Sequence, residues 1–330
     1  MPVTAPQSVD RKKSRDPGWH SAGIVLLIIV AYSVALWWLD RSNGTFQRLS
    51  SAWRWLSLAT LPVFASYLVR FWRWHWLLRR NGHRVPATRG LCAYLAGFAL
   101  TATPGKAGEL LRMRYFGSMG VPAAQTLATF VFERACDLLV ILVLSLAAAS
   151  LFPGLATLAC IVLAFVLLLF ATARWRMMHD VIERAIAHVP SFWLRRACVF
   201  ALSAARRLGS HLDARSLCMG LGTGALAWGL TSAVFMGVCA GFGVNIDPLL
   251  AFGIYPLAML VGSMSFIPGG VGTTELAIVL MLNRLGVGTG DALAVAVGTR
   301  LVTLWFATGV GGVAVLLLER MGIRSATDPR

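Results

Sequence analysis

The sequence Pro268-Gly-Gly-Val-Gly-Thr-Thr-Glu275 ends an apolar stretch that begins at Leu249, and apolar residues resume after it over Leu276–Leu282. Proline lacks the N–H that a helix interior uses, and glycine is a poor helix former, so this sequence predicts a break between two helices. A related sequence, Pro104-Gly-Lys-Ala-Gly-Glu109, ends the shorter apolar stretch Leu91–Thr103. The chain therefore contains two broken helices of the same kind.

The two breaks belong to an internal repeat with an offset of 166 residues, the distance from Glu109 to Glu275. An arginine follows each glutamate at the same spacing, Arg134 in the first copy and Arg300 in the second. Further matches at this offset are Gly120-Val121 with Gly286-Val287, Leu127-Ala128 with Leu293-Ala294, and Val131 with Val297. A break, a glutamate, a Gly-Val turn and an arginine in the same order make coincidence a poor explanation.

The composition is that of a polytopic membrane protein. Of the 330 residues, 57% are hydrophobic and 13% are charged, whereas a soluble domain has about 25% charged residues. The net charge of +16 does not indicate nucleic-acid binding, because the basic residues lie between long apolar runs rather than on a soluble basic domain. The six cysteines form no CxxC pair and the six histidines show no metal-ligand spacing, so we expect no cofactor.

Six segments are long enough to cross a bilayer, which requires about 20 apolar residues. Backbone groups freed at the two breaks cannot face lipid, so we predict that each broken segment enters the membrane, turns and leaves on its own side, near residues 91–116 and 249–283. A kinked spanning helix is the alternative. The predicted fold is all-α, with about six spanning helices and two re-entrant hairpins. The predicted spans are Trp19–Leu39, Leu56–Leu78, Thr126–Leu151, Leu155–Ala173, Leu217–Phe242 and Ala292–Leu318.

The distribution of lysine and arginine predicts the orientation. With this topology most basic residues fall on one side of the membrane, and the other side receives only Arg41, Arg48, Arg54 and Arg284. The basic side should be cytoplasmic, with both termini on it. Three spans separate the hairpins, so the hairpins open to opposite faces. This is an inverted repeat, a common transporter plan in which broken helices meet at a binding site near the midplane.

The predicted organisation has five parts. A basic cytoplasmic tail (1–18) precedes the first membrane half (19–173), a basic amphipathic loop (174–215), the second membrane half (216–319) and a cytoplasmic tail (320–330). Within the loop, apolar residues recur at helical spacing after Pro190, and arginines flank them. This pattern predicts a helix lying on the anionic inner leaflet, and a helix that docks a partner protein is the alternative.

Four acidic residues lie in or beside membrane segments, and all belong to the repeated units: Glu109, Glu133, Asp137 and Glu275. A charge at the centre of a membrane costs about 2.5–3.5 kcal/mol, so such residues are normally paired or functional. One interpretation is a set of structural ion pairs, in which Arg134 reaches an acid of its own helix or Glu109.

The other interpretation is a polar cavity for an anionic lipid headgroup. Lys106, Arg112, Arg134 and Arg300 would supply positive charge, and the glycine-rich turns would supply backbone N–H donors. Arg70 and Arg73 lie near the predicted cytoplasmic end of their span and are interpreted as snorkelling side chains. The candidate substrate-binding residues are Pro104, Gly105, Lys106, Gly108, Glu109, Arg112, Glu133, Arg134, Asp137, Pro268, Gly269, Gly270, Gly272, Glu275 and Arg300.

Three ordered motifs resemble a known family. They are Pro-Gly-x-x-Gly-Glu-x-x-Arg (Pro104 to Arg112), Glu-Arg-x-x-Asp (Glu133 to Asp137) and Pro-Gly-Gly-x-Gly-x-x-Glu (Pro268 to Glu275). Together they resemble the lysylphosphatidylglycerol synthase transmembrane, or flippase-like (UPF0104-type), family over about Trp19 to Leu318. The resemblance implies a lipid translocase of a bacterial or archaeal plasma membrane, with substrates such as aminoacylated phosphatidylglycerol, polyprenyl-linked sugars or hopanoids. Only a short tail follows Leu318 in place of a soluble aminoacyl-transferring domain, so lysyl-lipid synthesis is not expected.

Three functions follow as hypotheses. The first is a flippase, not an enzyme, that moves an anionic or polyprenyl-phosphate-type lipid and whose partners are membrane lipids. The second is an accessory scaffold for a lipid-modifying glycosyltransferase. The third is an integral-membrane enzyme with Glu109 or Glu275 as general base. The inverted repeat favours transport, because a scaffold does not require two opposed broken helices.

Overall fold

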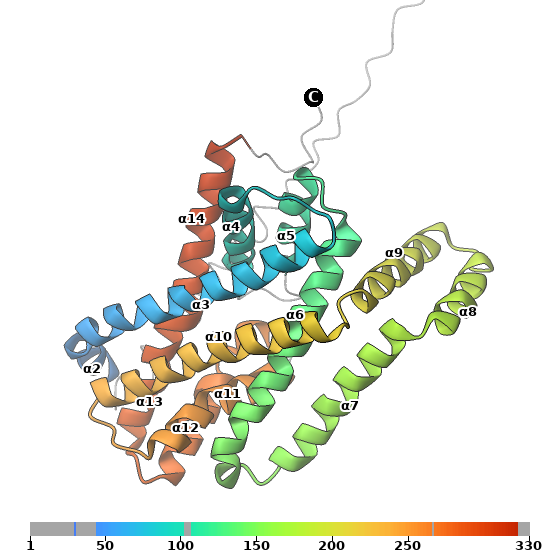
Figure 1. The fold of residues 1–330 in the computed structure, drawn as a ribbon. Coiled ribbons are helices and arrows are strands. Elements are labelled where there is room, and N and C mark those ends of the chain that lie inside the picture. The colour runs from blue at the N-terminus through green and yellow to red at the C-terminus, as the bar shows by residue number, and fades with distance from the viewer. Residues whose placement is uncertain (1–29, 31–43, 102–106, 266, 323–330) are drawn as a thin grey trace, which may run out of the picture.

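The structure, a computed structural model, describes residue 30 and residues 44–101, 107–265 and 267–322. Every regular element in these residues is a helix, as Figure 1 shows. Four segments are long and apolar enough to cross a membrane: Ala123–Leu151, Leu155–Arg174, Ala214–Gly241 and Thr289–Arg320. They confirm the all-α membrane fold and correspond to four of the predicted spans.

The other two predicted spans differ from these four. Trp19–Leu39 lies, apart from Val30, outside the described residues. Leu56–Leu78 falls within the 28-residue helix α3 (Trp53–Arg80), which is less apolar because it carries five arginines. A short helix, α2 (Thr45–Ser51), precedes α3.

The two broken segments have the same order of elements, and their second helices agree at the offset of 166. In the first, α4 (Ala87–Ala96) and the 3₁₀ turn η1 (Gly97–Leu100) precede α5 (Ala107–Ser118). In the second, α11 (Pro248–Met264) and the 3₁₀ turn η4 (Pro268–Gly270) precede α12 (Thr273–Arg284). Adding 166 to the bounds of α5 reproduces those of α12, and the two helices of each broken segment pack against each other.

The turns that follow the two broken segments share a glycine conformation and a backbone hydrogen bond. Gly120 and Gly286 both have a positive φ, 82° and 84°. Val121 N donates to Phe116 O at 3.0 Å, and Val287 N donates to Leu282 O at 3.1 Å. Glycine adopts this left-handed conformation without the steric penalty of a Cβ, which explains its place in both turns. The next helices, α6 (Ala123–Ser145) and α13 (Thr289–Arg300), again begin 166 residues apart.

The two repeats run in opposite directions. α6 begins beside the first broken segment, and its 3₁₀ extension η3 (Leu146–Leu151) packs against α11 of the second. The last helix does the reverse: α13 begins beside α12, continues through a π-helical turn, η5 (Leu301–Trp305), and ends as α14 (Phe306–Arg320) against α4 and η1. The broken segments therefore lie at opposite ends of these two long helices, as Figure 1 shows.

Helices α3 and α10 (Ala214–Gly241) form the closest pair in the fold, and they lie side by side and antiparallel in Figure 1. Glycines on α10 allow this approach. A Cβ at Gly220 would lie 2.7 Å from Cys136 Sγ of α6, and one at Gly224 would lie 3.2 Å from Arg73 Nη1 of α3. These glycines bring three helices together around a common point.

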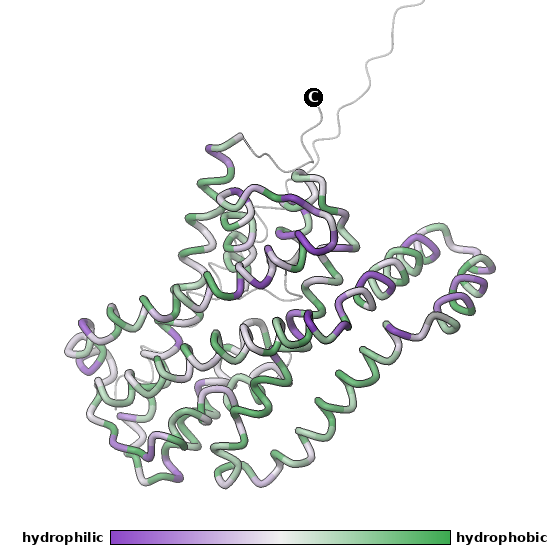
Figure 2. Tube along the Cα trace, in the orientation of Figure 1, coloured by the Kyte–Doolittle hydropathy of each residue, from purple (hydrophilic) through white to green (hydrophobic). Residues whose placement is uncertain are grey.

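Helices α7 to α9 lie between the two repeats in sequence, and they form a peripheral arm at the right of Figure 1. α7 (Leu155–Arg174) is apolar along its length, as Figure 2 shows, and most of it is exposed to the surroundings. Two amphipathic helices follow, α8 (Arg176–Ala187) and α9 (Phe192–Gly209), and α9 packs against α6 and α7. The helix that the sequence predicts after Pro190 corresponds to α9.

Candidate functional site

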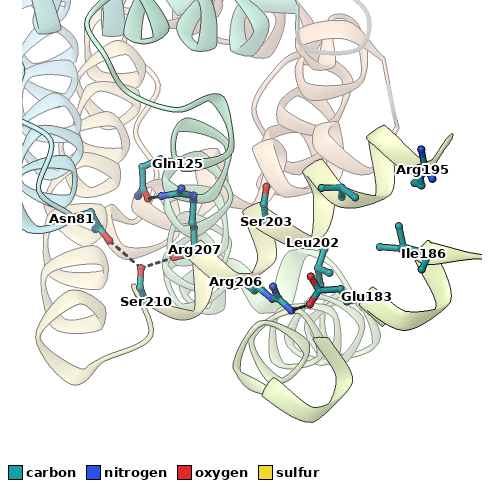
Figure 3. Close-up of a pocket in the computed structure, with 12 residues that line it drawn as sticks. Asn81, Gln125, Glu183, Ile186, Arg195, Leu202, Ser203, Arg206, Arg207 and Ser210 are labelled. Carbon is teal, nitrogen blue, oxygen red and sulfur yellow. Dashed lines mark hydrogen bonds and ion pairs between the residues drawn. The ribbon is translucent and has the colours of Figure 1, made fainter. Parts of the chain in front are cut away.

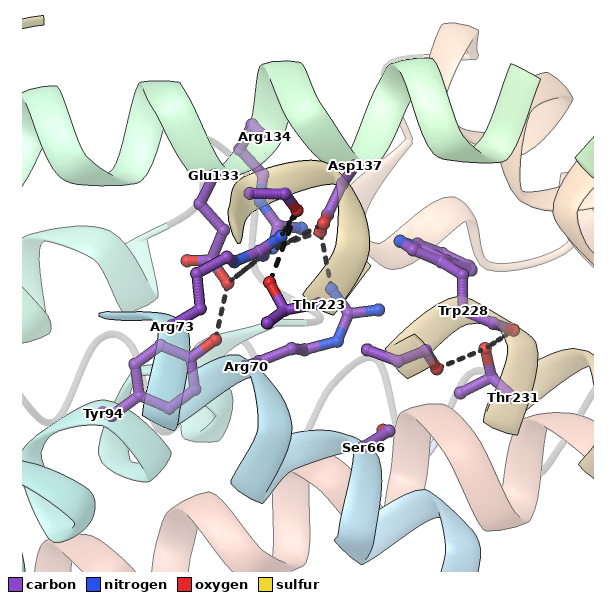
Figure 4. A network of polar contacts seen from close by, with 12 residues as sticks. Ser66, Arg70, Arg73, Tyr94, Glu133, Arg134, Asp137, Thr223, Trp228 and Thr231 are labelled. Carbon is purple, nitrogen blue, oxygen red and sulfur yellow. Dashed lines mark hydrogen bonds and ion pairs between the residues drawn. The ribbon is translucent and has the colours of Figure 1, made fainter. Parts of the chain in front are cut away.

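A buried charged cluster lies where α3, α6 and α10 meet (Figure 4). From α3, Arg73 Nη2 donates to Glu133 Oε1 at 2.8 Å and to Asp137 Oδ1 at 3.0 Å. Arg70 Nη1 donates to Asp137 Oδ2 at 2.5 Å. From α6 itself, Arg134 Nη2 lies 2.8 Å from Asp137 Oδ2 and 3.4 Å from Glu133 Oε1. Two carboxylates thus hold three guanidinium groups.

The first broken segment is joined to this cluster by two side chains. The hydroxyl of Tyr94, on α4, donates to Glu133 Oε1 at 2.7 Å. Arg112, on α5, donates from Nε to the Tyr94 carbonyl at 3.1 Å, and its Nη1 lies 3.8 Å from Glu133 Oε2. The Arg112 guanidinium also lies over the Tyr94 and Phe98 rings, at 4.0 and 5.1 Å from their centroids. Cation–π contact and the ion pair together fix the position of this arginine.

Helix α10 closes the cluster from the other side. The carbonyl of Gly220 accepts a hydrogen bond from Arg73 Nη1 at 3.0 Å. The Arg70 guanidinium lies 5.0 Å from the centroid of the Trp228 ring. The missing side chain at Gly224 leaves the space that the Arg73 guanidinium occupies.

The described members of the cluster carry a surplus of positive charge. Four arginines (Arg70, Arg73, Arg112 and Arg134) face two carboxylates. The side chain of Arg73 is 0% exposed, whereas that of Arg134 is 36% exposed. The acids therefore hold a buried arginine in place and leave a more accessible one at the edge of the cluster.

Counted along α6, the cluster lies at about half the length of helix that crosses a bilayer core. Glu133 is ten residues after Ala123, the start of α6. At a rise of 1.5 Å per residue this corresponds to roughly 15 Å, which is half of a hydrocarbon core about 30 Å thick. Arg300 has almost the same depth after Thr289, the start of α13.

The second repeat contains a simpler arrangement around Arg300. Its Nε donates to Glu275 Oε1 at 3.1 Å, and its Nη2 donates to the carbonyl of Gly269. Glu275 Oε2 in turn accepts from Gly272 N–H at 2.8 Å. Arg300 is 2% exposed, so these contacts form a closed clasp between α13 and the turn of the second broken segment.

The glycines of this turn behave only partly as the sequence predicts. Gly269 and Gly270 both have φ of 62°, a left-handed backbone conformation that glycine adopts readily. The expectation that their N–H groups serve as anion donors is wrong for two of the turn's glycines. Gly270 N donates to Ile267 O, and Gly272 N donates to Glu275. The turn presents a carbonyl to Arg300 instead.

Several candidate residues of the first repeat cannot be compared with the structure. Pro104, Gly105 and Lys106 lie outside the described residues. Gly108 and Glu109 lie in the first turn of α5, and the side chain of Glu109 is outside the described part. The pairing of Glu109 with Arg134 therefore stays a prediction. Pro268 begins the 3₁₀ turn η4.

Residues 22–311 match the family described as the lysylphosphatidylglycerol synthase TM region. The chain belongs to this family. It is also similar to a UPF0104 membrane protein from Methanothermobacter thermautotrophicus, at 26% identity over 99 residues. That match covers 30% of this chain and only 29% of the relative's own length. These findings confirm the family resemblance, and they are consistent with a multi-pass membrane protein that has a lipid-related function.

In this member of the lysylphosphatidylglycerol synthase TM family, the interpretation of Arg70 and Arg73 as snorkelling side chains is wrong. Both are buried and paired with the acids of α6. Arg70 and Arg73 are three residues apart on α3, and Glu133 and Asp137 are four apart on α6. Residues three or four apart lie on the same face of a helix, so the two arginines can meet the two acids. This complementarity was visible in the sequence and predicts the pairing once α3 and α6 are taken as neighbours. Tyr94 has no comparable signal.

Proposed function

We propose that the protein is a lipid translocase that moves an anionic or polyprenyl-phosphate-type lipid, or an aminoacylated phospholipid, across the membrane. The buried arginine surplus at the junction of α3, α6, α10 and the first broken segment carries this proposal. Guanidinium groups bind phosphate through paired, charge-assisted hydrogen bonds. Arg134, the more exposed of the four, is the group that contacts the headgroup, and Arg73 and the two acids keep it positioned.

The inverted repeat supplies the second requirement of a translocase. Two broken segments at opposite ends of α6 and α13–α14 allow a central site to open alternately to either side. The clasp of Arg300 with Glu275 and Gly269 holds the second segment to its long helix. We place the protein in the plasma membrane with both termini cytoplasmic, on the basis of the charge distribution.

Reconstitution into liposomes tests this function. Fluorescent phosphatidylglycerol, lysyl-phosphatidylglycerol, a polyprenyl phosphate and phosphatidylcholine are compared in a dithionite-quenching assay. We expect protein-dependent movement of at least one of the first three lipids without movement of the zwitterionic phosphatidylcholine, and a strong loss of that movement in Arg134→Ala. Arg320→Ala, at the exposed end of α14, is the matched control.

The assay also separates the alternatives. If no lipid moves in well-inserted protein, an accessory role beside a lipid-modifying enzyme becomes the better account. If every lipid moves equally and Arg134→Ala has no effect, the arginine cluster is structural. If a lipid is chemically changed, the protein is an enzyme and the proposal fails.

A further inference from the structure

A second basic site lies at the end of α3 and the start of α6, and it shares no residue with the arginine cluster. A cavity of about 660 Å³ opens between the arm helices α8 and α9, the end of α3 and the start of α6 (Figure 3). Volumes of about 300–1,000 Å³ are typical of small-molecule sites. Three arginines, Arg195, Arg206 and Arg207, and one acid, Glu183, line it.

The charges of this cavity are only partly neutralised. Arg206 Nη2 lies 2.5 Å from Glu183 Oε2 and 3.6 Å from Asp180 Oδ1. Arg207 donates from Nη1 to the neutral amide oxygen of Gln125 at 3.3 Å. Among the described residues, neither Arg207 nor Arg195 has a carboxylate within ion-pair distance. Two arginines thus remain to bind an anion.

The floor of the cavity is a neutral hydrogen-bonding network. His211, which is 0% exposed, lies 3.2 Å from Gln125 Nε2 and 3.4 Å from Asn81 Nδ2 through its two ring nitrogens. Burial lowers the pKa of His211 to about 4, so the ring is neutral at pH 7 and does not add to the charge. Ser210 Oγ donates to Asn81 Oδ1 at 3.0 Å. The network joins the cavity to α3 and α6, the helices that hold the arginine cluster.

The position of the cavity favours a lipid over a soluble ligand. α8 begins at Arg176, directly after the apolar span α7 ends at Arg174, so the cavity lies at the level where that span leaves the bilayer. Apolar side chains extend from its wall to the outside: Val199 lines the cavity and is 54% exposed, and Trp193 on the same helix is 75% exposed. Basic groups beside exposed apolar groups match a headgroup and its acyl chains.

We propose that this cavity binds the headgroup of an anionic phospholipid, with Arg195 and Arg207 on the phosphate and the apolar rim of α9 against the acyl chains. This site is separate from the transport site and does not depend on the proposed transport. The shared chemistry, a phosphate group, also occurs in soluble anions, so the test includes both sources.

Native mass spectrometry of the purified full chain in detergent provides the test. Phosphatidylglycerol or phosphatidylcholine is added at equal concentration, with glycerol phosphate and inorganic phosphate as soluble competitors. The variants are Arg195→Gln, the double variant Arg195→Gln with Arg207→Gln, and Ser203→Trp, which fills the cavity. Arg196→Gln is the matched control, because this exposed neighbour on α9 does not line the cavity.

We expect a phosphatidylglycerol adduct that phosphatidylcholine does not form. Its dissociation constant should rise about tenfold in the double variant and in Ser203→Trp, corresponding to about 1.4 kcal/mol, and about threefold in Arg195→Gln. Arg196→Gln should bind as the unchanged protein does. The exposed single variant Arg195→Gln keeps the test valid if the double variant folds poorly.

Four results would overturn the proposal. Equal weakening by Arg196→Gln would indicate diffuse surface charge. Complete displacement by glycerol phosphate at the lipid's own concentration would identify a soluble anion as the occupant. An equally strong phosphatidylcholine adduct would remove the role of charge. Loss of the adduct in Arg134→Ala would show that the lipid binds in the arginine cluster. A protein that keeps the adduct but moves no lipid would contradict only the proposed transport.

Discussion

The two halves of the molecule share their backbone and differ in their chemistry. The first half carries Glu133, Arg134 and Asp137 on α6, and the residues 166 positions later on the last long helix are Thr299, Arg300 and Thr303. Only the arginine is common to both. In the first half the acids of α6 bind arginines from other helices, whereas in the second half the broken segment itself satisfies Arg300.

Under the proposed function, this difference separates two tasks. A closed clasp holds one broken segment to its helix. The cluster, in which the described arginines outnumber the described acids and the Arg134 side chain is 36% exposed, would bind the charged headgroup. The duplicated backbone therefore does not imply two equal half-sites, and substitutions at equivalent positions should have unequal effects.

The largest effect on stability is expected for Arg73→Ala. Its removal leaves Glu133 and Asp137 buried with fewer partners, and breaking a buried ion pair in this way costs about 3–5 kcal/mol. Thermal unfolding in detergent, followed by tryptophan fluorescence, measures the loss. Arg73→Lys should recover part of it. An unchanged midpoint in Arg73→Ala would show that the cluster does not stabilise the first half.

A smaller loss is expected for Arg300→Ala in the second half. The clasp contains one acid, and Glu275 keeps its hydrogen bond from Gly272 N–H after the arginine is removed. Loss of the charge-assisted bonds should cost about 2–3 kcal/mol. The exchange of Glu275→Arg with Arg300→Glu should not restore stability or transport, because the new carboxylate would face the Gly269 carbonyl. Full recovery by the exchange would contradict this account of the clasp.

Gly270→Ala should have a moderate effect confined to the second half. The position has φ of 62°, where a Cβ costs about 1–2 kcal/mol, and that Cβ would lie 2.6 Å from Thr274 Oγ1. Gly222→Ala is the control, since nothing lies within 4 Å of its Cβ position on α10. Equal unfolding midpoints in the two variants would show that the turn tolerates another conformation.

The smallest effect on stability should accompany Arg134→Ala, although its effect on transport should be strong. The side chain is 36% exposed, and Asp137 keeps Arg70 and Arg73 as partners. A loss below about 1 kcal/mol is typical of partly exposed ion pairs. Parallel measurements of unfolding and lipid movement are required. A large fall in stability with unchanged transport would reverse the roles that we assign to Arg134 and Arg73.

The sequence predicts much of this fold because the repeat is recorded in local features. A Pro-Gly break, a Gly-Val turn and an arginine at fixed spacing determine where helices begin and end. The boundaries of α5 and α12 then agree at the predicted offset. Length and apolarity identify four of the six predicted spans, since a bilayer sets one length for all of them.

The sequence does not predict which charges meet, because that depends on how helices cross. Arg70 and Arg73 reach the acids of α6 only because Gly220 and Gly224 let α3, α6 and α10 approach closely. Distance from the end of a span instead suggested that these arginines extend to the membrane surface. The Gly270 and Gly272 N–H groups likewise have partners within the turn, which composition alone does not reveal.

The π-helical turn Leu301–Trp305 sets the rotational register of the last helix. A π turn holds one residue more than the α turn that it replaces, and each residue of an α-helix advances it by about 100°. Before this turn Arg300 faces the second broken segment, and after it Gly311 packs against Phe98 and Ala99 of the first. If the same residues continued as a regular α-helix, Gly311 would be turned away from that contact by about 100°. A single extra residue thus lets one helix contact the broken segments of both halves.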